Sequence, residues 1–117
     1  MLSRYDIVPV AFPFTDGPAV KPRPALVITT NDRHQDVLLA FISSNVSGPI
    51  ALARDELDIP ADHPGFSDTG LKVSSRLRLS RMTTLAMPLV KRRIGRLPLA
   101  LQTDCLQMLQ RVIGGQG

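Results

Sequence analysis

Apolar and polar residues alternate in short blocks along most of the chain, a pattern typical of β-strands. The clearest blocks are rich in valine, isoleucine, leucine and phenylalanine and are bounded by turn-forming residues; they cover 6–14, 23–30 and 36–43. In 71–85 apolar positions such as Leu77 and Leu79 alternate with arginines, which predicts a strand buried on one face. Shorter strands are predicted at 49–52 and 89–97, with Gly95 at a bulge.

The periodicity changes after Pro98, where apolar residues recur at intervals of three and four. The positions that share one face at this spacing are Leu101, Cys105, Leu109 and Val112. They predict an amphipathic helix that ends at the Gly114–Gly115 pair. Five or six short strands and one helix predict a mainly β fold: a small, strongly curved, barrel-like antiparallel sheet with a C-terminal amphipathic helix, forming a single domain over 1–117.

Composition excludes several classes of protein. Cys105 is the single cysteine, so the chain can form neither an internal disulfide nor a cysteine-based zinc site. The first residues lack the apolar stretch of a signal peptide, and no apolar run reaches membrane-spanning length, which predicts a cytoplasmic protein without a membrane partner. The acidic segment 55–70 matches no metal-binding spacing and predicts an exposed loop, so we expect no metal and no cofactor.

Charge is distributed unevenly along the chain. Residues 1–71 carry five basic and nine acidic side chains, whereas 72–96 carry eight basic side chains and no acid. A concentrated basic segment suggests a polyanionic partner such as nucleic acid, although solvated strand faces explain it equally well. The five aromatic residues are too few for a large base-stacking surface.

The strands at 23–30 and 36–43 are joined by the turn "NDRHQ", and the register of this hairpin brings two polar residues together. In an antiparallel pair, the sequence numbers of opposed residues have a constant sum. A turn centred on Arg33 pairs Ala25 with Phe41 and places Arg23 opposite Ser43, at the end of the sheet far from the turn. A guanidinium and a hydroxyl at one point suit phosphate binding. An arginine that closes the end of the barrel beside a serine bonded to backbone is the simpler interpretation, and it stays open here.

Five segments, taken in order, resemble the PemK/MazF family of bacterial toxins. They are "DIVPVAFPFTD", "KPRPALVI", "DVLLAFISSN", "GLKVSSRLRLSRMTTL" and "RRIGRL", and the resemblance runs from about Asp6 to Leu109. It implies a toxin of a type II toxin–antitoxin system: a metal-independent, sequence-selective endoribonuclease that cleaves single-stranded RNA, leaving a 2′,3′-cyclic phosphate and a 5′-hydroxyl. It also implies a homodimer, an acidic antitoxin as partner, and DNA binding by the toxin–antitoxin complex.

The resemblance also assigns site residues. The family's catalytic arginine maps onto Arg23 and its catalytic threonine or serine onto Ser43, the pair that the hairpin register opposes. Further substrate contacts are expected from Lys21, Ser44, Thr15 and Arg76. A basic face that serves RNA or antitoxin is expected to include Arg92, Arg93 and Arg96.

The chain departs from the family pattern at two places. Tyr5 stands where many members have glycine before the first strand, and Ser80 followed by Arg81 stands where many have an acid in the fifth strand. The second departure bears on substrate preference more than on activity. The two histidines, His34 and His63, are predicted to be solvated loop residues without a catalytic role.

Two other functions compete with RNA cleavage. A CcdB-like toxin that inhibits DNA gyrase has a related fold but needs no arginine and hydroxyl pair, so the "RPALVI" block with Ser43 argues against it. A catalytically degenerate family member would keep the fold and bind its partners without cutting RNA.

Overall fold

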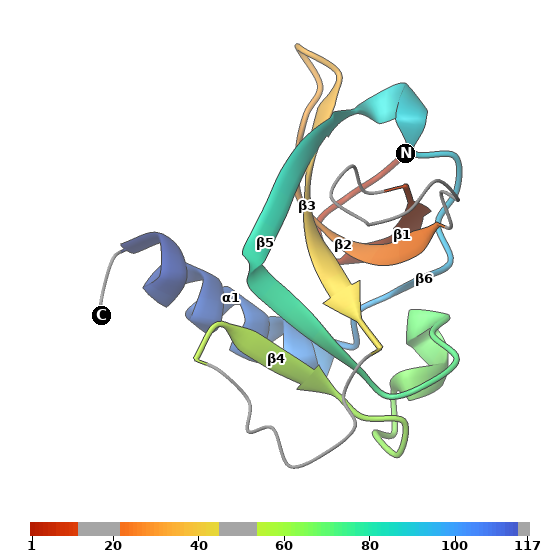
Figure 1. Ribbon diagram of the computed structural model, residues 1–117, viewed down its shortest axis with the longest axis vertical. Helices are drawn as coiled ribbons and strands as arrows, with labels where there is room; N and C mark the ends of the chain where they lie inside the picture. The colour runs from red at the N-terminus through yellow and green to blue at the C-terminus, as the bar shows by residue number, and fades with distance from the viewer. Residues whose placement is uncertain (12–21, 45–53, 115–117) are drawn as a thin grey trace.

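The computed structural model describes residues 1–11, 22–44 and 54–114, which form one antiparallel sheet and one α-helix (Figure 1). The strands are β1 (Asp6–Val10), β2 (Arg23–Asn31), β3 (Asp36–Ser43), β4 (Glu56–Ile59), β5 (Ser75–Ala86) and β6 (Gly95–Arg96), in the order β4-β5-β3-β2-β1-β6. The 3-10 turns η1 (Phe66–Thr69) and η2 (Met87–Leu89) flank β5, and α1 (Leu99–Gly114) ends the described chain. The sheet curls into a half-barrel with α1 beside β4 and β5, which confirms the predicted fold class (Figure 1).

Each face of the sheet carries a cluster of buried apolar residues, and α1 covers one of the two. The first core lies under α1, where Leu101, Cys105 and Leu109 pack against residues such as Ile42 and Leu77. The second core lies on the opposite face and consists of Val8, Val10, Ala25, Val27, Val37 and Leu39. Odd-numbered positions of β3, and of β2 up to Val27, therefore lie on the face of the second core, and this parity decides which side chains share the candidate site.

The predicted register of the β2–β3 hairpin is confirmed up to Ala25 and Phe41, two residues short of the predicted opposition of Arg23 and Ser43, which are not paired with each other. Ala25 pairs with Phe41 and Val27 with Leu39. Nearer the turn the sum rises by one, since Asn31 pairs with Asp36, and an irregularity between Val27 and Thr29 absorbs the difference. The turn is thus centred half a residue later than predicted. Beyond the irregularity, toward Arg23, the strands pair in the predicted register.

Prolines explain why the pairing of β2 with β3 ends at Ala25 and Phe41. Pro24 lies opposite Pro9 of β1, and two prolines can exchange no N–H···O bond, so this is a non-hydrogen-bonded position of the β1–β2 pair. The nitrogen of Pro24 consequently faces β3, where the ladder needs an N–H that proline lacks. Arg23 and Ser43, the residues of these two strands farthest from the turn, therefore lie beyond the backbone pairing of β2 with β3, although both remain in strands.

The acidic segment 55–70 corrects one prediction. It was expected to be an exposed loop, but Glu56–Ile59 forms β4, whose Leu57 and Ile59 are buried in the first core. Its acids alternate with apolar residues, so the carboxylates face away from that core while the segment pairs with β5. The strand predicted at 49–52 lies outside the described residues.

The segment 89–97 forms less strand than predicted. Only Gly95–Arg96 pairs, as β6, with Asp6 and Ile7 of β1. Gly95 is required by a close approach: a Cβ there would lie 2.2 Å from the carbonyl carbon of Thr69. The predicted helix is confirmed as α1. Among the described residues, no helix has the length and apolar character needed to cross a membrane.

Candidate functional site

The end of the sheet opposite the β2–β3 turn carries the two residues predicted to act in catalysis. Arg23 is the first residue of β2 and is exposed, and Ser43 is the last residue of β3 and is partly exposed. Both lie two residues beyond the last β2–β3 pair, Ala25 with Phe41. By the alternation of side chains along each strand, both lie on the same face of the sheet as the second core.

The same face carries two cross-strand rows that extend from β3 to β4. In the first row Ser43 pairs with Arg76, which pairs with Asp58. In the second row Phe41 pairs with Arg78, which pairs with Glu56. Directly opposed residues project to the same side of a sheet, so arginines and carboxylates lie beside Ser43. Arg76, a predicted substrate contact, is thus adjacent to Ser43 in the sheet.

One of these cross-strand pairs is an ion pair. Nε of Arg78 lies 3.5 Å from Oε2 of Glu56, and the side chains retain 35% and 17% of their exposure. The geometry is that of an ion pair without a hydrogen bond from Nε, which is buried. A guanidinium and a carboxylate thus reach the solvent together, close to Ser43.

The pairing of β3 with β5 is interrupted at this point. Ala40 pairs with Met82, but the next residue, Phe41, pairs with Arg78, so three residues of β5 are skipped. The interruption turns Arg81 onto the second-core face, where its guanidinium carbon lies 5.6 Å from the centre of the Phe41 ring. Arg81 is one of the residues at which the chain departs from the family pattern, and sequence reasoning gave it no contact.

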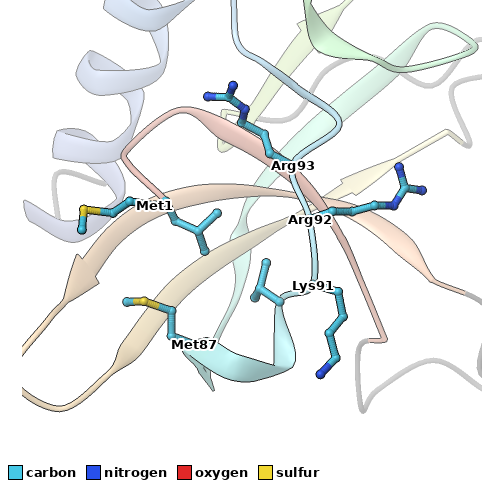
Figure 2. Close-up of a pocket in the computed structure, with 7 residues that line it drawn as sticks. Met1, Met87, Lys91, Arg92 and Arg93 are labelled. Carbon is cyan, nitrogen blue, oxygen red and sulfur yellow. The ribbon is translucent and has the colours of Figure 1, made fainter.

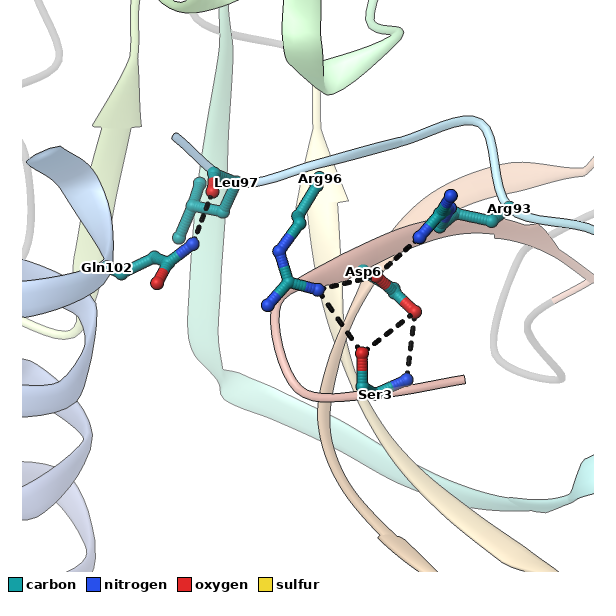
Figure 3. A network of polar contacts seen from close by, with 6 residues as sticks. All are labelled: Ser3, Asp6, Arg93, Arg96, Leu97 and Gln102. Carbon is teal, nitrogen blue, oxygen red and sulfur yellow. Dashed lines mark hydrogen bonds and ion pairs between the residues drawn. The ribbon is translucent and has the colours of Figure 1, made fainter. Parts of the chain in front are cut away.

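Two of the arginines predicted to form a basic face also pair with a buried carboxylate. Asp6 is fully buried, and its Oδ1 lies 2.9 Å from Nη1 of Arg96 and 3.4 Å from Nη1 of Arg93 (Figure 3). Its Oδ2 accepts a 2.8 Å hydrogen bond from the backbone N–H of Ser3. Since a buried carboxylate needs partners, these arginines hold their segments against β1. Their side chains keep 56% and 45% of their exposure, so the pairing with Asp6 leaves both on the surface, and their part in a basic face stays a prediction.

The chain matches a known protein family. Residues 3–113 match the family described as PemK-like, MazF-like toxin of type II toxin-antitoxin system. The chain belongs to this family.

Solved structures agree with the fold of this PemK/MazF-family toxin. It is similar to MazF from Deinococcus radiodurans, with a TM-score of 0.69 at 18% identity over 97% of this chain and 96% of that one. It is similar to the Mycobacterium tuberculosis toxin MazF-mt6, with a TM-score of 0.64 at 20% identity over 93% and 96%. A mycobacterial endoribonuclease in complex with its cognate antitoxin gives 0.68 at 13% identity over 97% and 96%. No curated protein sequence matches the chain.

The remaining predicted site residues of the toxin fall in different places. Ser44 follows Ser43 directly and is exposed. Lys21 and Thr15 lie outside the described residues. His34 is exposed in the β2–β3 turn, at the far end of the sheet, and Nδ1 of His63 accepts a 3.0 Å hydrogen bond from the N–H of Gly65 within its own loop. The two histidines therefore lie in different loops.

A groove of about 410 Å³ lies at another part of the surface (Figure 2). Its lining combines apolar and basic side chains: Met1, Leu2, Met87, Val90, Lys91, Arg92 and Arg93. Arg92 and Arg93 of the predicted basic face are both exposed here, and Arg93 is also paired with Asp6. None of the predicted catalytic or substrate-contacting residues that the structure describes lines this groove.

The sequence analysis missed Glu56, Asp58 and the Phe41–Arg81 contact. The two acids were assigned to a loop because acidic residues and prolines dominate that segment. A usable signal was present, since the apolar residues Leu57 and Ile59 alternate with these acids and with Pro60. The Arg81 contact depends on an interrupted ladder, for which the sequence offers no comparable signal.

Proposed function

We propose that this toxin is an endoribonuclease that cleaves single-stranded RNA without a metal ion, with Arg23 and Ser43 in its site. The observation that carries the proposal is the position of these two residues: they end neighbouring strands, on one face, in a chain of the PemK/MazF family. Further support comes from Arg76, which pairs with Ser43 and adds positive charge where a phosphate would lie.

The proposed reaction needs charge stabilisation rather than a redox or metal step. The ribose 2′-oxygen loses its proton and attacks the adjacent phosphorus, the bond from phosphorus to the 5′-oxygen breaks, and that oxygen gains a proton. The products are a 2′,3′-cyclic phosphate and a 5′-hydroxyl. Arg23 binds two phosphate oxygens through its planar fork and stabilises the charge that builds on them. Its guanidinium stays protonated, so it does not serve as the base.

Ser43 supplies a hydroxyl that hydrogen-bonds the same phosphate or relays a proton. Because the nucleophile is the 2′-hydroxyl, which DNA lacks, DNA of the same sequence binds but is not cut. A homodimer, an acidic antitoxin that inhibits the toxin, and DNA binding by the complex belong to the same proposal. One structural relative is a complex with its cognate antitoxin, which supports the antitoxin part of it.

The proposal is tested by incubating the purified protein with a long single-stranded RNA in the presence of EDTA. We expect cleavage that Arg23→Ala reduces by about 10²- to 10³-fold, the usual effect of removing one oxyanion-stabilising donor. Ser43→Ala should also be impaired, and Ser43→Thr should keep most of the activity because it keeps the hydroxyl.

Arg33→Ala is the matched control, since Arg33 is an exposed arginine in the same hairpin at its other end. Undiminished cutting by a folded Arg23→Ala protein contradicts the site assignment. Intact RNA together with loss of DNA gyrase supercoiling favours the CcdB-like alternative. Intact RNA and unaffected gyrase, with RNA still bound, favour the catalytically degenerate alternative.

A further inference from the structure

We propose that Phe41, Arg81, Arg78 and Glu56 form a subsite that binds a guanine base next to the cleaved bond. The inference rests on the proposed function, because it takes single-stranded RNA as the ligand of this face. It adds which base the toxin selects and which side chains select it. The four residues come from β3, β4 and β5 and lie on the second-core face together with Ser43.

A stacking surface is the first component of the subsite. Phe41 is partly exposed, and the guanidinium of Arg81 lies over its ring at 5.6 Å. Unstacked RNA bases are held by stacking on aromatic rings and on the planes of arginine guanidinium groups. The Phe41–Arg81 pair presents both kinds of plane on a face where the ladder between β3 and β5 is interrupted. Base stacking of this kind contributes about 1–3 kcal/mol per base.

An edge-reading pair is the second component. Glu56 and Arg78 are held 3.5 Å apart in the row that contains Phe41, so they border the stacking surface. Both side chains are partly exposed, at 17% and 35%, and remain accessible to a ligand. The carboxylate of Glu56 only accepts hydrogen bonds, and the guanidinium of Arg78 only donates them. Side by side, they offer two acceptor oxygens from Glu56 and, next to these, N–H donors from Arg78.

Guanine is the base whose Watson–Crick edge complements this order. Its exocyclic amine and ring N1–H are adjacent donors, which the two carboxylate oxygens accept, and its O6 is an acceptor for Arg78. Cytosine and adenine each offer one amine to the carboxylate and no ring N–H at that edge. Uracil places its single N–H between two carbonyl oxygens, one of which would face the carboxylate. Guanine thus makes the largest number of contacts.

Distance along the sheet places the base beside the scissile phosphate. Ser43 and Arg76 form the neighbouring row, so Ser43 and Arg78 are diagonal neighbours across β3 and β5. Diagonal neighbours of this kind are about 7–8 Å apart, a span that one nucleotide bridges. A guanine on Phe41 therefore belongs to the nucleotide on one side of the phosphate that contacts Arg23 and Ser43.

The test measures binding and cleavage separately. Ten-nucleotide oligouridine RNAs that carry one central guanine, inosine, cytosine or adenine are bound to Arg23→Ala protein, which is expected to cut RNA far more slowly than wild type, and affinities are read by fluorescence anisotropy. Inosine lacks the exocyclic amine and is otherwise the same base. We expect the guanine RNA to bind about 10-fold more tightly than the inosine RNA, and Glu56→Gln to bring this ratio close to one.

Asp62→Asn is the matched control, because it neutralises an exposed acid in the loop that follows β4 and should leave the ratio unchanged. In wild-type protein, mapped cuts in a long RNA should have guanine directly beside the cleaved bond. Equal affinity for the guanine and inosine RNAs, or a preference for cytosine, overturns the subsite. Guanine-selective binding without cleavage upholds the subsite and overturns the proposed function, and cleavage without guanine selectivity does the reverse.

Discussion

Tyr5 has a backbone conformation that side chains rarely adopt. Its φ is +77°, in the left-handed region that favours glycine. Its N–H donates a 2.9 Å hydrogen bond to the carbonyl oxygen of Val27, which keeps the backbone in this conformation. The ring packs against the first core, so burial of an aromatic side chain offsets the backbone strain.

This position should reverse the usual order of glycine and alanine substitutions. Tyr5→Ala loses the aromatic packing and keeps the strain, whereas Tyr5→Gly loses the packing and removes the strain. We expect the free energy of unfolding of Tyr5→Gly to exceed that of Tyr5→Ala by about 1 kcal/mol, measured by urea denaturation. Thr84, an exposed residue of β5, provides the control, since the Thr84→Gly protein should be less stable than the Thr84→Ala protein. Equal stabilities at position 5 would argue against strain.

The helix α1 is held on the sheet by a narrow apolar face. Leu101, Cys105 and Leu109 are its buried residues, and Cys105 is 1% exposed. Burial raises the pKa of the Cys105 thiol to about 11, against a small opposing effect of the Arg4 charge. The folded protein thus holds the thiol in its neutral form.

The attachment of α1 should weaken at alkaline pH. A thiol whose pKa is raised on folding contributes stability that is fully present below its unfolded pKa of 9.0 and is lost as pH rises toward about 11. We expect wild-type protein to lose more stability than Cys105→Ala across pH 9 to 11, measured by urea denaturation at each pH. Parallel curves for the two proteins would mean that Cys105 does not titrate in this range. Native protein should also resist modification by thiol reagents near neutral pH.

The arrangement of charge in the whole molecule differs from that in the sequence. Apart from Lys72, the cations of the segment 72–96 divide into arginines that bind Asp6, cations beside the apolar groove, and arginines on the second-core face with Ser43. The last group lies with Arg23 on one surface although β2 and β5 are far apart in sequence. The candidate RNA surface is therefore defined by four arginines: Arg23, Arg76, Arg78 and Arg81.

Binding of single-stranded RNA should depend on salt accordingly. Each phosphate neutralised on a single strand contributes about −0.7 to the slope of log affinity against log salt concentration, so Arg23 and Arg76, the two arginines assigned to phosphates, predict a slope of about −1.4. We expect Arg23→Ala to make the slope shallower by about 0.7 and Arg33→Ala to leave it unchanged. The slopes are measured by fluorescence anisotropy titrations at salt concentrations from about 50 to about 200 mM. A slope near zero would show that this surface does not bind phosphates.

Local pattern was sufficient for most of the elements. The strands at 23–30, 36–43 and 71–85 and the helix after Pro98 were predicted because each carries a strong period of apolar residues. The failures have physical causes. Acids at alternate positions concealed β4, whose apolar residues are buried only because β5 and α1 lie beside it. Gly95 was assigned to a bulge because the local pattern does not show the close approach of Thr69, which is distant in sequence.

The sequence alone determined the class of fold, the register that directs Arg23 and Ser43 to one end of the sheet, and the resemblance that gave them a role, because these depend on local periodicity and on one short hairpin. The tertiary structure decided what surrounds that pair. The capture of Arg93 and Arg96 by Asp6, the rows from Ser43 and Phe41 to the acids of β4, and the contact of Arg81 with Phe41 all join segments that only the curled sheet brings together. Such contacts depend on strand order and on an interrupted ladder, and neither property is encoded in the pattern of any single segment.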